Sequence, residues 1–127
     1  MNRQIESFRD LRVYRESIEL QQAVFENSKH WPKEEKYALT DQARRSSRSI
    51  GANLAEAWAK RRYPSHFVSK LTDSDGELQE TSHWLTTALA CGYIAEEVIA
   101  ELERRIMRIG GMLGTMISKS ESFRPKH

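Results

Sequence analysis

The sequence is short of the residues that cross-link or interrupt a chain. Cys91 is its single cysteine among 127 residues, which excludes a disulfide within the chain and is typical of a reducing compartment. No apolar run reaches the length of a membrane span or of a signal-peptide core. The formal net charge is only +2, so total charge does not indicate a nucleic-acid partner. We therefore expect a cytoplasmic protein without a membrane-spanning segment.

Proline and glycine are also scarce, and charged residues make up 30% of the chain. This composition is typical of a soluble helical domain and not of a disordered chain. A length of 127 residues is enough to bury a core within one domain. The chain shows no internal repeat, so we expect residues 1–127 to form a single domain.

Four amphipathic segments account for most of the chain. Their apolar residues recur at intervals of three and four, which predicts helices over about residues 7–30, 35–60, 65–91 and 95–118. The third segment has the most regular pattern, with core positions at Phe67, Leu71, Ser74, Leu78, Thr81, Leu85 and Ala88. Short connections between long helices predict an all-α, antiparallel up-down-up-down four-helix bundle. The polar tail, residues 119–127, is expected to be frayed.

One stretch, SRSIGANLAEAWAKRR (residues 47–62), lacks the charged face that a surface helix normally carries. The side opposite its apolar core stripe carries four small residues, Gly51, Ala52, Ala55 and Ala59. Small residues permit close approach of another helix, and a contiguous apolar patch is unusual on a soluble monomer. We therefore predict that this face packs against a neighbouring subunit. The alternative is a solvated alanine-rich face, because alanine favours helix.

Longer motifs allow a comparison with a known family. The blocks WPKEEKYALTDQARRSSRSIGANLAEA (residues 31–57), DGELQETSHWL (75–85) and CGYI (91–94) carry it. Within the first block, the matching positions are Pro32, Glu35, Tyr37, Leu39, Gln42, Arg44, Arg45, Ser49, Ile50, Asn53, Ala55 and Glu56. Over roughly residues 8–117, the chain resembles the four-helix-bundle proteins encoded within intervening sequences of bacterial 23S rRNA genes. It departs from them at Ala57, where the family usually has glycine.

The resemblance implies more than a fold. It implies a bundle assembled as a homo-oligomer, commonly a pentamer, with no established catalytic activity. A distant relative, the accessory protein of diversity-generating retroelements, is a basic pentameric bundle that works with nucleic acid. RNA is therefore the partner that the resemblance suggests, beside other copies of the chain itself.

Two basic clusters are the candidate nucleic-acid site. Arg44, Arg45 and Arg48 lie within the second segment, and Arg61 and Arg62 follow its end. A ring of subunits would repeat such a patch around its axis, which strengthens the attraction for phosphates. The alternative is a solvated helix face whose arginines pair with Asp41 or with the acidic residues of the third segment.

A polar flank runs beside the core stripe of the second segment. We predict that Gln42, Ser49, Asn53 and Glu56 form a polar network with Glu77, Ser74 or Thr81 of the third segment. Partly buried polar groups must be paired, and such a pair can fix the register of two helices. The alternative is that these residues bind a ligand.

Two patterns suggest chemistry that we do not expect. Glu80 and His83 have the Glu-x-x-His spacing of di-iron bundles, with Glu56 and Glu77 as further ligands, but such sites need this motif on two helices. Arg61 and His66 have the spacing of a helical RNA-cleaving motif, but Pro64 places them in a turn. We therefore expect no enzyme activity, no metal and no cofactor. Metal binding and RNA cleavage remain the alternative functions.

Three glycines interrupt the fourth segment. Gly110, Gly111 and Gly114 each cost about 1 kcal/mol of helix stability relative to alanine. A compensating gain is expected, and the usual one is close approach of a neighbouring helix. A local kink is the alternative.

Overall fold

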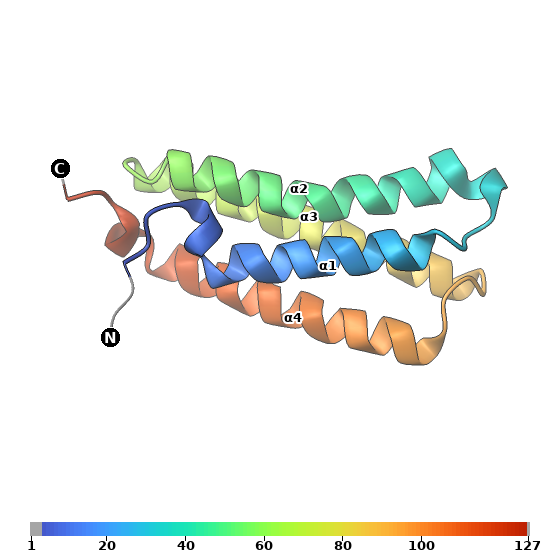
Figure 1. The fold of residues 1–127 in the computed structure, drawn as a ribbon. Coiled ribbons are helices and arrows are strands. Elements are labelled where there is room, and N and C mark those ends of the chain that lie inside the picture. The colour runs from blue at the N-terminus through green and yellow to red at the C-terminus, as the bar shows by residue number, and fades with distance from the viewer. Residues whose placement is uncertain (1–3, 127) are drawn as a thin grey trace.

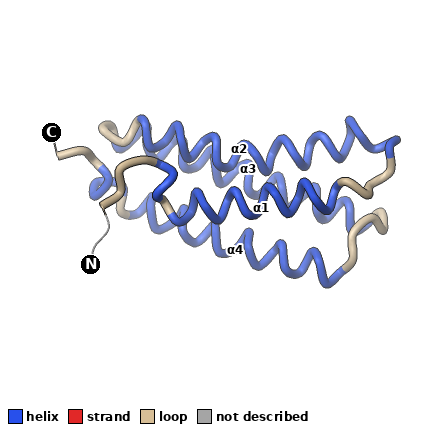
Figure 2. The backbone as a smooth tube through the Cα atoms, viewed as in Figure 1, coloured by secondary structure: helices blue, strands red, loops and turns tan. Residues whose placement is uncertain are grey.

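The computed structural model describes residues 4–126, and within them four long α-helices form an antiparallel bundle (Figure 1). The helices are α1 (Arg12–Ser28), α2 (Asp41–Ala59), α3 (Pro64–Ala90) and α4 (Glu96–Ser118). Helices α1 and α3 each pack against both α2 and α4, so α2 and α4 occupy opposite corners. The predicted all-α four-helix bundle is confirmed. Figure 2 shows that loops are confined to the two ends of the bundle and that no strand is present in the described residues.

The helix boundaries depart from the predicted ones for local reasons. The predicted first helix, 7–30, is divided because Leu11 is extended, with ψ of 128°, so a short 3-10 turn, Phe8–Asp10, precedes α1. The predicted second helix, 35–60, begins with a wider turn of π type, Lys36–Thr40, before α2 starts. Phe8 and Leu39 continue the apolar spacing of the two helices, which is why periodicity alone joined these turns to them.

The C-terminal tail is more ordered than predicted. Ser120–Phe123 forms a 3-10 turn, and the Phe123 ring lies 5.3 Å from the ring of Phe67 in α3. Burial of this one aromatic side chain against the bundle holds the tail in place. Part of the tail that was expected to fray, Ser120–Phe123, thus forms a turn against α3, and residue 127, like residues 1–3, lies outside the described residues.

The buried polar side chains of the described residues are serines and threonines, and three of them lie between α2 and α3. Ser46 and Thr81 share a hydrogen bond of 2.9 Å, and the Ser74 hydroxyl donates to the Ile50 carbonyl at 2.9 Å. These three side chains are buried, and each forms a hydrogen bond. No hydroxyl group among them therefore carries the free-energy cost of burial without a partner. Small hydroxyl residues also let α2 and α3 approach closely in the middle of the bundle.

The turn after α3 is set by Gly92. Its φ of +78° is the left-handed conformation that favours glycine. The Tyr93 amide donates to the Ala88 carbonyl at 2.9 Å, and the Gly92 amide donates to the Leu89 carbonyl at 3.0 Å. This is the Schellman arrangement that ends a helix.

The glycines of α4 do not have the role that the sequence suggests. A Cβ atom added to Gly110 would lie 3.6 Å from Leu78 Cδ2, which is ordinary contact. A Cβ atom added to Gly111 or Gly114 would meet nothing within 4 Å. The prediction of close helix approach at these glycines therefore fails within one chain, because Gly111 and Gly114 face open space.

A single hydrogen bond ties two loops at the end of the bundle that lies away from the termini. The Tyr93 hydroxyl donates to Glu35 Oε2 at 2.9 Å. This hydrogen bond, with burial and the negative charge of Glu35, raises the pKa of Tyr93 from about 10 to about 12.

This shifted pKa predicts an alkaline loss of stability. Because the folded-state pKa is raised, the stabilisation is fully present below pH 10 and is lost as pH rises through about 12. Tyr93→Phe is expected to be less stable than the wild type at neutral pH, with the difference shrinking between pH 10 and 12. Urea denaturation across this range measures it. Tyr37→Phe, at an exposed tyrosine, is the control, and an equal pH dependence in both variants would contradict the assignment.

Candidate nucleic-acid interface

The three arginines of α2 line one hollow but contact different neighbours. The Arg44 guanidinium lies 4.8 Å above the Phe25 ring of α1, and its Nε donates to Ser28 Oγ at 2.8 Å. Arg48 lies over the same ring at 5.6 Å. Arg45 turns to the other side of α2, toward α3. The predicted cluster thus surrounds one hollow of about 490 Å³, in which Arg44 and Arg48 contact α1 and Arg45 contacts α3.

Arg45 is engaged with carboxylates of α3. It forms ion pairs with Glu77, at 3.2 Å, and with Glu80. Glu80 also accepts a hydrogen bond of 3.1 Å from the Trp84 indole. The indole hydrogen bond, helped by Arg45, holds the pKa of the Glu80 carboxyl below its usual value. Since two carboxylates flank this one guanidinium, Arg45 contributes little to a surface that attracts phosphates. For Arg45, the alternative of pairing with acidic residues of the third segment therefore describes the structure.

The predicted polar flank exists, but two cations organise it. Arg45 Nε donates to Gln42 Oε1 at 3.4 Å and pairs with Glu77. Lys70 of α3 donates to Asn53 Oδ1 at 3.3 Å and pairs with Glu56 at 3.4 Å.

The remaining member of the flank, Ser49, bonds only within α2. Its hydroxyl donates to the Arg45 carbonyl at 2.9 Å. The suggested partners Ser74 and Thr81 lie deeper, where they bond to the Ile50 carbonyl and to Ser46. The flank is therefore a partly exposed ion-pair seam. The buried register contacts between α2 and α3 are the hydroxyl groups beneath it.

The small-residue face of α2 needs one correction. Gly51 is buried, and a Cβ atom there would lie 3.2 Å from Ser17 Oγ and 3.3 Å from Tyr14 Cε1 of α1. It therefore packs inside the chain and is not on the outer surface. Ala52 and Ala59 are exposed and Ala55 is half-buried.

The residues of the two alternative functions are separated. Glu56 pairs with Lys70, whereas Glu77 and Glu80 converge on Arg45. Within residues 4–126, no three His, Cys, Asp or Glu side chains are placed to hold a metal ion.

The two residues of the RNA-cleaving pattern also have different surroundings. The Arg61 guanidinium stacks 4.0 Å above the Trp58 ring and donates to the Trp58 carbonyl at 2.8 Å. His66, in the first turn of α3, lies 5.6 Å from the Tyr63 ring. The structure thus holds Arg61 against α2 and places His66 beside an exposed tyrosine.

A basic end of the bundle emerges only in three dimensions. We call residues 60–62 and 119–126 the basic end. It contains six cations, Lys60, Arg61, Arg62, Lys119, Arg124 and Lys126, and one carboxylate, Glu121. Residues 4–12 lie at the same end and add two cations and two carboxylates, so they leave the balance unchanged. Figure 1 shows the turn between α2 and α3 and both termini at this end.

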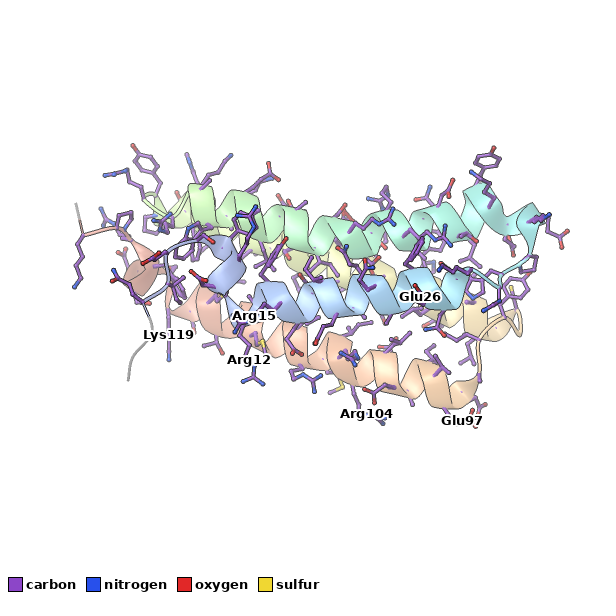
Figure 3. All side chains as sticks on the ribbon, viewed as in Figure 1. Arg12, Arg15, Glu26, Glu97, Arg104 and Lys119 are labelled. Carbon is purple, nitrogen blue, oxygen red and sulfur yellow. The ribbon has the colours of Figure 1, made fainter. Side chains whose placement is uncertain are left out.

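The opposite end has the opposite charge. Residues 29–41 and 91–97 contain three lysines against five carboxylates, which are Glu34, Glu35, Asp41, Glu96 and Glu97. In Figure 3, Lys119 lies toward the basic end and Glu97 toward the opposite end. The net charge of +2 therefore conceals a polarity along the bundle axis.

The basic end also has a hollow and exposed aromatic surface. A hollow of about 640 Å³ is lined by Trp58, Arg61, Phe123, Arg124 and Lys126, together with Gln4, Ile5, Ser122 and Pro125. Tyr63, which directly follows Arg62 in the sequence, is 58% exposed. The cations of the tail were missed as site residues because the tail was expected to be frayed. Phe123, a lone aromatic residue in a polar segment, was the signal that it docks.

No helix in the described part of the chain is both long enough and apolar enough to span a membrane.

Comparisons with known proteins concern the family and the fold of the chain. The chain matches the family model described as 23S rRNA-intervening sequence protein over residues 9–115. It is similar to a solved structure, a protein of unknown function from the S23 ribosomal protein family of Bacteroides thetaiotaomicron. The two have 28% sequence identity and a TM-score of 0.74, and the similarity covers 83% of this chain and 97% of that chain. No match is found among curated proteins. The resemblance inferred from the sequence motifs is confirmed.

Proposed function

The chain belongs to the 23S rRNA-intervening sequence protein family, and from this premise we propose that it is a non-enzymatic bundle that binds RNA as a homo-oligomer. The observation that carries the proposal is the basic end, where six cations face one carboxylate. Phosphate contacts by lysine and arginine supply most of the sequence-independent affinity for nucleic acid. The acidic opposite end repels the same ligand, so the charge polarity orients the bundle on RNA.

The basic end favours single-stranded RNA. Stacking on Trp58 fixes the Arg61 guanidinium, so less conformational entropy is lost when it contacts a phosphate. Tyr63 is exposed directly beside Arg62 and offers a ring on which an unpaired base can stack. Arg44 and Arg48 have no ion pair to a carboxylate among the described residues, and they extend the cationic surface along the groove between α1 and α2.

Assembly would multiply this surface. Ala52 and Ala59 are exposed and Ala55 is half-buried along the outer side of α2, and these three residues form the face that we assign to a neighbouring copy. The family resemblance suggests a ring of five chains. Such a ring repeats each basic end around one axis, and several weak phosphate sites then act together on one RNA strand.

Salt dependence tests the RNA proposal. The double variant Arg61→Gln/Arg62→Gln is expected to bind single-stranded RNA more weakly at all sequences. Its slope of log affinity against log salt should fall by about 1.4, since each lost contact to a single strand removes about 0.7. Fluorescence anisotropy with a labelled oligonucleotide at several salt concentrations measures both quantities.

The matched control is Arg104→Gln/Arg105→Gln, which removes the same charge from α4, where both arginines pair with Glu101. Its slope should equal that of the wild type. If both double variants lower the slope equally, net charge and not the basic end governs binding. If Arg44→Gln/Arg48→Gln has the larger effect, the site lies along α2 instead.

A further inference from the structure

An apolar hollow lies between α1 and α4, beside the basic end. It has a volume of about 440 Å³, within the range of about 300–1,000 Å³ that small-molecule sites occupy. Its apolar lining comes from Ile5, Leu11, Val13, Met112, Met116 and Phe123. The hollow is thus an apolar surface that no side chain of the described residues fills.

One residue in the wall of the hollow is a glycine. Gly111 is part of the lining, and a Cβ atom on it would meet nothing within 4 Å. A larger residue at this position would therefore extend into the hollow without displacing any neighbour. Glycine in a helix costs about 1 kcal/mol relative to alanine, and packing within the chain gives no compensation for it here.

The polar groups at the rim are not equivalent. Arg108 Nε is paired with Glu16 Oε1 at 2.9 Å, and the Thr115 hydroxyl donates to the Gly111 carbonyl at 3.1 Å. Arg12, at the start of α1, has no hydrogen bond or ion pair with any residue of the described chain, 4–126, and it is exposed. Figure 3 labels Arg12 at the side of α1 that faces α4. The hollow therefore combines an apolar body with one uncompensated guanidinium at its edge.

We propose that this hollow binds a linear alkyl carboxylate of medium length, with its chain against the methionines and its head group on Arg12. The mostly apolar lining favours a hydrocarbon ligand. The guanidinium at the rim complements an anionic head group and forms a charge-assisted hydrogen bond with it. The hollow adjoins that of the basic end, with which it shares Ile5 and Phe123, but its lining contains none of the six cations of the basic end.

Octanoate and 1-octanol are the probes, in isothermal titration calorimetry with the full-length protein. Both are expected to bind at one site per chain. Arg12→Gln should weaken octanoate about tenfold, the effect of losing one charge-assisted hydrogen bond, and leave 1-octanol unchanged. Gly111→Leu should weaken binding of both probes, because its side chain takes up part of the hollow.

Gly114→Leu is the matched control. Gly114 is also an exposed glycine of α4 with nothing within 4 Å of a Cβ atom, but it does not line the hollow. This variant should bind both probes like the wild type. The proposal is overturned if wild-type protein binds neither probe, or if Gly111→Leu and Gly114→Leu bind equally well. It is also overturned if Gly111→Leu instead lowers the molar mass of the assembly, because the hollow is then an interface between copies.

Discussion

Replacing Gly51 by leucine is expected to lower the free energy of unfolding by roughly 1–3 kcal/mol, the cost of overpacking a filled interior. A Cβ atom at this position already lies 3.2 Å from Ser17 Oγ and 3.3 Å from the Tyr14 ring, so the remaining atoms of leucine have no room. The strain is relieved only at the cost of moving the Tyr14 and Ser17 side chains or of shifting α1 away from α2. Urea denaturation followed by circular dichroism measures the loss.

Gly76→Leu provides a control with the same change of residue. Gly76 is an exposed residue of α3, and a Cβ atom there would meet nothing within 4 Å. This variant should be unchanged or more stable by up to about 1 kcal/mol, because leucine is the better helix former. Equal effects of the two substitutions would show that Gly51 does not hold α1 against α2 and would return it to the outer face.

Gly51 also illustrates what periodicity predicts and what it leaves open. The spacing of apolar residues placed Leu71, Leu78 and Leu85 in the core, and all three are fully buried. Large apolar side chains at regular spacing predict a buried face, because exposing them to water costs free energy. A glycine carries no such signal: it is compatible with a solvated face, a subunit contact or a close helix contact. Only the position of α1 decides among these.

The candidate site was predicted in part for a similar reason. The short-range cluster at Arg61 and Arg62 is visible in the sequence, whereas Lys119, Arg124 and Lys126 join it only because the chain returns to the same end. Arg44, Arg45 and Arg48 are neighbours in sequence and line one hollow, but the sequence does not reveal that two carboxylates of α3 pair with Arg45. Charge that is close along a helix is therefore a weaker indication of a patch than charge at one end of a bundle.

A substitution on the outer face of α2 is expected to have the second large effect, which is on the assembly of the chains. Ala55→Arg is expected to convert the proposed homo-oligomer to single chains without loss of helix. Ala52 and Ala59 are exposed on either side of it, next to the half-buried Trp58, and a close contact through alanine leaves no space for a guanidinium. Light scattering after size-exclusion chromatography should give the molar mass of five chains for the wild type and of one for the variant.

Ala52→Arg is the second variant: Ala52 is exposed whereas Ala55 is half-buried, so loss of the assembly in Ala52→Arg does not result from altered packing within the chain. Ala100→Arg, at an exposed alanine of α4, introduces the same charge on the opposite corner of the bundle and should leave the assembly intact. Circular dichroism should show equal helix content in all three variants. Because a ring uses two different surfaces of each chain, loss of one face is enough to open it, and a wild-type protein that is monomeric at high concentration would refute the interface.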